Sequence, residues 1–151
     1  MGLFNLFKQE SQQDVHKNEN SLVVVMSKCM DAVKAYQNHE FSIAATLFEE
    51  YFTMKGYGRF PELDMDDYRM YINFMLSQFY SHNYLECIKT CEILSLLEPK
   101  RGDSYAFKAL CLLKLGKEPD ADFFWEKANL LGSELPSHFD NIHDVKMEGY
   151  N

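Results

Sequence analysis

Four cysteines are the side chains of this chain with the widest chemical range, and they are Cys29, Cys87, Cys91 and Cys111. Each lies inside an apolar segment with helical spacing, and none belongs to a pair of Cys-x2-Cys motifs of the kind that binds zinc. Cys87 and Cys91 lie one helical turn apart, and a buried free thiol at such a position usually packs as a small apolar group. We therefore expect reduced core cysteines and no metal site among them.

A polar group near the C-terminus is the second candidate for chemistry, and it consists of His138, Asp140, His143 and Asp144. Imidazole and carboxylate groups are suitable ligands for a divalent ion, but a polar tail offers them no fixed geometry and we expect no metal there. The chain also lacks the GxSxG, GxGxxG and P-loop motifs that accompany nucleophilic catalysis and nucleotide binding. The sequence predicts a protein that is not an enzyme, with no catalytic residue, no metal and no cofactor.

The charge balance limits the classes of partner. The 151 residues contain 15 basic and 23 acidic side chains, which gives a net charge of -8. An acidic protein without a basic patch repels phosphate backbones, so we expect no nucleic acid partner. No stretch approaches the ~20 apolar residues that a membrane-spanning helix needs. The sequence therefore predicts a cytoplasmic protein with no membrane span.

The apolar residues divide the chain into three segments. Residues 1–20 hold a short apolar cluster followed by a polar linker, residues 21–132 have apolar side chains at helical spacing, and residues 133–151 form a C-terminal tail. The apolar cluster of the first segment consists of Leu3, Phe4, Leu6 and Phe7. The middle segment is the only one expected to form a packed domain.

The middle segment contains stretches that are each long enough for an ordinary helix. Short turns join them two by two, which is the spacing of antiparallel helix hairpins. The predicted helices are Ser21–Asn38, Glu40–Lys55, Asp66–Ser81, Tyr84–Leu97, Asp103–Leu115 and Asp120–Leu131.

An internal repeat relates these hairpins. The second and third match at a shift of 34 residues, a period typical of one repeat family, while the first joins at a shift of 43 because the stretch 56–67 lengthens the link after it. The matching residues of the second and third hairpins are Tyr71, Met75, Cys87, Cys91 and Leu94 with Tyr105, Ala109, Ala121, Trp125 and Ala128, and those of the first are Ala32, Ala44, Phe48 and Tyr51.

On these residues the chain resembles the tetratricopeptide repeat family over about residues 25–132. The third copy matches best, with Gly116 at the turn and a small residue four positions before Trp125. Departures are Lys108 at a normally apolar position, and His39 and His82 where the family has a turn glycine. The resemblance implies an all-α fold, a right-handed superhelix of antiparallel helix hairpins with three repeats. An ordinary six-helix bundle is the competing architecture.

The resemblance also implies a binding surface, because the first helix of each hairpin lines a concave groove in that family. The groove would be mostly apolar, which predicts a protein-protein interaction module, an adaptor or chaperone that binds an apolar segment of another polypeptide. The residues that map onto this predicted groove are Met26, Cys29, Met30, Val33, Tyr36, Arg69, Ile72, Asn73, Leu76, Phe79, Asp103, Ala106, Phe107, Leu110 and Leu113.

Several alternatives for the groove and its partner remain open. The segment Tyr68–Tyr80 is apolar nearly all round, so something should cover it. The candidates are a partner, the chain's own connection 56–67, its own terminal segments, or the N-terminal cluster of a second copy in a homo-oligomer. By its size, acidity and groove character the chain is similar to the small chaperones of type III secretion translocators. A different class of function is an acidic immunity or inhibitor protein that neutralises a basic partner.

Overall fold

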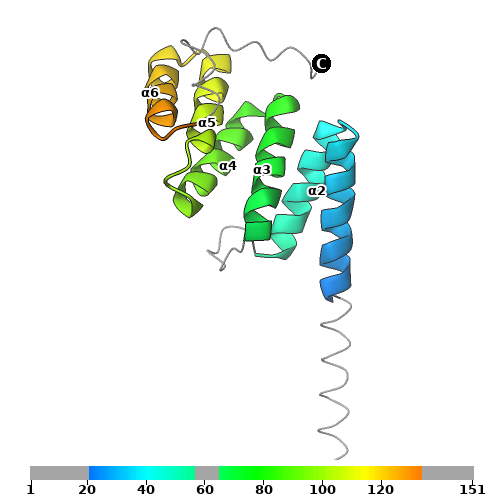
Figure 1. Cartoon of the computed structure of the whole chain (residues 1–151). Coiled ribbons are helices and arrows are strands. Elements are labelled where there is room, and N and C mark those ends of the chain that lie inside the picture. Colours follow the sequence, from blue (N-terminus) through cyan, green and yellow to red (C-terminus); the bar gives the residue numbers. More distant parts are fainter. Residues whose placement is uncertain (1–20, 57–64, 134–151) are drawn as a thin grey trace, which may run out of the picture.

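The computed structural model describes residues 21–56 and 65–133, and the described chain is helical without a strand. A helix through residues 21–37 comes first, drawn in blue in Figure 1, and five labelled helices follow it. These are α2 (Phe41–Met54), α3 (Met65–Tyr80), α4 (Tyr84–Leu97), α5 (Asp103–Lys114) and α6 (Glu118–Leu130). The prediction of an all-α fold is confirmed.

The helices form a stack in which each one packs against its neighbours in the sequence (Figure 1). The helix of residues 21–37 is tied to α2 by an ion pair between Lys28 Nζ and Glu50 Oε2, which lie 2.6 Å apart. Further along, α2 packs on α3, α3 on α4, α4 on α5 and α5 on α6. A stack in which the main contacts join sequence neighbours is typical of a solenoid rather than a closed bundle, and the structure is an all-α solenoid of helix hairpins.

The turns between the two helices of each hairpin share one backbone conformation. His39, His82 and Gly116 have positive φ angles of 61°, 63° and 74°, and Gly132 repeats this conformation after α6 with a φ of 74°. The N–H of the residue after each one donates to the carbonyl five positions earlier, at N···O distances of 2.8 to 3.0 Å. This is the Schellman arrangement that closes a helix. The two histidines thus occupy the place of the turn glycine.

The repeat positions hold equivalent places in the core. The small residues at the joint between paired helices are all fully buried, which lets the helices approach closely. They are Ala32, Ala44, Cys87, Ala109 and Ala121. Phe48, Cys91 and Trp125 are buried one helical turn further along the second helices. Tyr105 differs, because it is only half-buried and its ring stacks on Phe124 at a centroid distance of 6.4 Å.

Lys108, at a normally apolar repeat position, is accommodated by its neighbours. Its side chain is 15% exposed, and Nζ lies 2.9 Å from an Oε1 of Glu92 on α4. The same ammonium lies 4.2 Å from the centre of the Phe124 ring on α6. The stem of a lysine can pack as an apolar group while its head finds a carboxylate and an aromatic face. The charge therefore links three helices.

A buried polar cluster joins the first hairpin to the second. Asp67 is 4% exposed; its Oδ1 accepts a hydrogen bond from the hydroxyl of Tyr51 at 3.2 Å and pairs with the ammonium of Lys55. The link 57–64 lies outside the described residues, as do residues 1–20, with their apolar cluster, and residues 134–151, with the group from His138 to Asp144.

Candidate protein-binding surfaces

The predicted groove residues all lie on the first helices of the hairpins, namely the helix of residues 21–37, α3 and α5. They differ in how far they are open to a partner. Met26, Met30 and Arg69 are exposed, and Phe79, Ala106 and Leu110 are buried. The others are half-buried: Cys29, Val33, Tyr36, Ile72, Asn73, Leu76, Asp103, Phe107 and Leu113.

Several of these half-buried and buried groups contact the chain itself. Phe79 and Phe107 meet edge to face with their ring centroids 5.3 Å apart, which brings α3 and α5 together. The Asp103 carboxylate accepts a hydrogen bond from the Ser133 hydroxyl at 2.8 Å. Burial raises the pKa of the Cys29 thiol, although a hydrogen bond with Tyr51 opposes this shift. The surface left for a partner is therefore smaller than the predicted set.

The apolar helix α3 is covered mainly by its neighbours. The rings of Tyr71 and Phe52 stack at a centroid distance of 3.9 Å, and Phe74 packs 6.2 Å from Phe48. These contacts bury one side of α3 against α2. Ile72 and Leu76, one helical turn apart, stay half-buried. On α3, these two residues are the apolar side chains of the predicted groove that a partner could still cover.

Exposed apolar side chains gather on the helix of residues 21–37. Five of them have between 54% and 70% of their surface exposed: Leu22, Val23, Val24, Met26 and Met30. Scattered apolar residues are normal on a surface, but several on neighbouring turns of one helix mark an interaction site. The predicted groove includes Met26 and Met30 but not the other three, although the run of apolar letters from 22 to 26 is visible in the sequence.

A hollow of about 400 Å³ lies elsewhere in the structure, between the second helices of the first two hairpins. None of its residues belongs to the predicted groove, because no spacing pattern links side chains that only the stacking of two hairpins brings together. Its walls come from α2, α3, the turn after α3 and α4, and its lining residues are Ser42, Ala45, Thr46, Glu49, Phe74, Gln78, Ser81, His82, Asn83 and Glu86.

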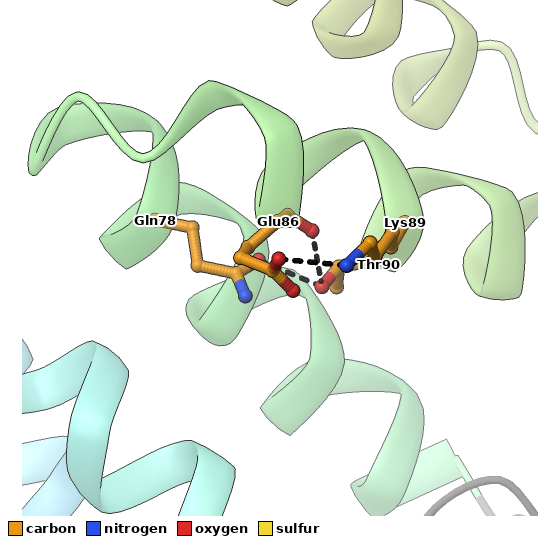
Figure 2. A network of polar contacts seen from close by, with 4 residues as sticks. All are labelled: Gln78, Glu86, Lys89 and Thr90. Atoms are coloured by element: carbon orange, nitrogen blue, oxygen red, sulfur yellow. Dashed lines mark hydrogen bonds and ion pairs between the residues drawn. The ribbon is translucent and has the colours of Figure 1, made fainter.

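A polar network forms one wall of this hollow (Figure 2). The Thr90 hydroxyl lies 2.7 Å from Gln78 Oε1 and 3.3 Å from the backbone carbonyl of Glu86. The carboxylate of Glu86 pairs with Lys89 Nζ at 2.7 Å on the outside of α4. Gln78 and Thr90 are buried, so this network fixes the carboxamide of Gln78 in one position beside the hollow.

Cys87 and Cys111 in the core are held as neutral thiols. A hydrogen bond with Cys87 and burial raise the pKa of Cys111 far above its usual range. For Cys87 the hydrogen bond with Cys111 lowers the pKa, but a hydrogen bond with Cys91 and burial outweigh it, so the net shift is upward. A thiol must lose its proton to bind a metal or attack an electrophile. Within residues 21–56 and 65–133, no group of three or more potential ligands is placed to hold a metal ion.

The stack of hairpins has a counterpart among solved structures. The chain folds like PcrH. The superposition covers 80% of this chain and 90% of that chain with a TM-score of 0.57 and 17% sequence identity, and PcrH was solved in complex with the chaperone binding region of PopB. No family model matches the sequence, and no curated protein matches it either. No helix in the described stretches of the chain is long and apolar enough to cross a membrane.

Proposed function

We propose that this protein is a tetratricopeptide-type adaptor or chaperone that binds an apolar segment of another polypeptide on the face of its first helices. The observation that carries the proposal is the set of exposed apolar side chains on residues 21–37, above all Met26 and Met30, which are 57% and 70% exposed. Ile72 and Leu76 on α3, which are half-buried, are the other apolar side chains of the proposed surface. Support comes from PcrH, which shares the fold and binds a region of another protein.

This proposal includes the finer expectations from the sequence. The chain acts in the cytoplasm without catalysis, metal or cofactor, and its partner is a polypeptide rather than a nucleic acid. Full burial of a large apolar side chain stabilises a complex by about 1.5–3 kcal/mol before ordering costs. A client that covers Met30 and Leu76 therefore gains enough from these two side chains for their loss to be measurable.

The test is a pair of double variants matched in chemistry. Met30→Glu with Leu76→Glu places two charges on the proposed surface, and Leu85→Glu with Leu96→Glu places two charges on α4. Leu85 and Leu96 are 61% and 67% exposed, so the control variant should fold. We expect proteins captured by the wild type from cells that express this chain to be lost with the first variant and kept with the second. Capture unaffected by the first variant would refute the proposed surface.

A second function, neutralisation of a basic partner, is favoured by one observation. The chain has a net charge of -8. Glu49 on α2 and Glu86 on α4 line the hollow. An inhibitor that works through such charges binds less tightly as salt rises, because counterions screen the attraction, whereas apolar burial changes little. Repeating the capture at low and high salt separates the two functions.

A further inference from the structure

The C-terminal segment of the chain begins at the edge of the proposed client surface. Ser133 is 3% exposed, and its hydroxyl donates a hydrogen bond to the Asp103 carboxylate at 2.8 Å. Asp103 is the first residue of α5 and belongs to the predicted groove. At the repeat shifts of 34 and 43 residues, its equivalents on the other first helices are Arg69 and Met26. Residue 134 therefore follows directly beside the face that the first helices share.

The segment that follows is long enough to reach every first helix. It comprises the 18 residues 134–151, which span about 60 Å when fully extended and about 27 Å when helical. Packed helices lie about 8–10 Å apart, so two spacings from α5, across α3, to the helix of residues 21–37 amount to about 20 Å. Even in its shorter form the segment can cross the client surface.

The sequence of this segment has an apolar side and an acidic side. Leu135, Phe139 and Ile142 recur at spacings of four and three residues, the pattern of one apolar helix face. The other positions include one lysine and four acids, which are Glu134, Asp140, Asp144 and Glu148. A segment with this pattern gains free energy when its apolar side covers an apolar surface.

The end of the stack does not match this segment. On α4, the carboxylate of Glu92 meets the ammonium of Lys108 on α5 at 2.9 Å. The residues 34 positions later are Glu126, which is exposed on α6, and Ile142. If the segment stacked on α6 as a further first helix, a carboxylate would therefore face an apolar side chain, and its desolvation would be unfavourable. The apolar side of the segment fits another surface better.

The face of the first helices offers such a surface. Met26 and Met30 are 57% and 70% exposed, and Ile72 and Leu76 on α3 are half-buried. Arg69 precedes the latter two by three and seven residues, so it lies on the same side of α3. Its side chain is exposed and forms no ion pair within the described part of the chain. This cation is complementary to the acidic side chains of the segment.

We propose that the C-terminal segment 134–151 occupies the client surface of its own molecule until a client displaces it. The inference rests on the proposed function, because it gives that surface an internal competitor. A segment tethered at Ser133 acts at an effective concentration on the order of millimolar, so weak apolar contacts suffice to hold it. A client must bind more tightly than the segment, which limits binding to clients that bury more apolar surface.

Photocross-linking of the purified full-length protein tests the position of the segment without any client. Benzoylphenylalanine replaces Leu76 in one variant, Met30 in a second, and Leu96 on α4, which is 67% exposed, in a control. We expect the first two positions, and not the third, to be joined to residues 134–151 of the same molecule, as identified by mass spectrometry of the monomer. A cross-link from either site supports the proposal. Cross-links only to a second molecule or only to other segments, or none, would overturn it.

Two variants of the segment with the same added charge provide the matched control. Phe139→Glu with Ile142→Glu charges the apolar side and should abolish the cross-links, while Ser137→Glu with Asn141→Glu charges the opposite side and should keep them. The first variant should also bind the client identified by capture at least ~5-fold more tightly, because its competitor is lost. Equal cross-linking by both variants, or unchanged client binding by the first, would contradict the proposal. Cross-links in a protein that captures no client would refute the proposed function and keep the segment on this surface.

Discussion

The hairpin turns allow a quantitative test of the repeat, through the substitution Gly116→Ala. Gly116 has a φ of 74°, and a Cβ added there would meet no atom within 4 Å. The substitution therefore changes backbone energy without a clash. The reciprocal substitution is His39→Gly, because His39 holds the equivalent turn position with a φ of 61°.

The expected magnitude follows from two opposing terms. A non-glycine residue in the left-handed region costs about 1–2 kcal/mol, and replacing glycine by alanine recovers about 0.4–1 kcal/mol by restricting the unfolded chain. Gly116→Ala should therefore destabilise the protein by about 1 kcal/mol. His39→Gly should stabilise it by slightly less, because the histidine also loses its edge contact with Phe41, whose ring centroid is 5.5 Å away.

Urea denaturation followed by the fluorescence of Trp125, which is 7% exposed, would measure both changes. For a domain of this size, a change of 1 kcal/mol corresponds to a shift in melting temperature of about 2–4 °C. A gain in stability for Gly116→Ala, as in the middle of an ordinary helix, would show that the turn does not have the left-handed conformation. A loss for His39→Gly larger than the loss of its aromatic contact would contradict the equivalence of the turns.

Three further outcomes test other regions of the structure. Gly102→Ala should lower the free energy of unfolding by about 1–3 kcal/mol in urea titrations, because its Cβ would lie 2.6 Å from the carbonyl oxygen of Ala128; unchanged stability would exclude this close approach. Asp67→Asn should lower the free energy of unfolding by about 1–3 kcal/mol, because it breaks the ion pair with Lys55. The lysine side chain is 35% exposed, so the pair is only partly desolvated. A higher free energy of unfolding in the variant would show that the pair is not formed. The pKa of Cys111 is raised from the usual 9.0, so the thiol of the unfolded chain loses its proton first as pH rises. The contribution of this group to stability should therefore be constant below about pH 9 and fall above it. Unfolding midpoints of the wild type and Cys111→Ala, measured from pH 7 to 10, should diverge above about pH 9.

The helices could be predicted from the sequence because apolar spacing and turn chemistry agree along most of the chain. The predicted bounds of Tyr84–Leu97 match α4. The sequence predicts a start of α6 at Asp120, after Pro119, whereas the helix begins at Glu118. Proline is tolerated in the first turn, where the backbone N–H has no partner within the helix. A proline near a helix start therefore marks the first turn and not the residue before it.

The candidate sites could be predicted only incompletely. The repeat pattern assigns Met30 and Leu76 to first helices, and the structure leaves Met30 exposed and Leu76 half-buried. The pattern does not reveal that Phe79 packs against Phe107. That contact depends on how closely α3 and α5 approach, which is decided only when the second hairpin packs on the third. Side-chain burial in a solenoid is thus decided by neighbouring repeats rather than by the period itself.

The hollow illustrates the same limit more strongly, since Glu49 and Gln78 are far apart in the sequence and meet only when the first hairpin packs on the second. In sequence, Gln78 interrupts an apolar helix and could be taken for a solvated position, whereas the structure buries it with Thr90 as its partner. A polar residue retained in an otherwise apolar helix needs a defined hydrogen-bond partner. The sequence does not show that Thr90, 12 positions further on, is this partner for Gln78.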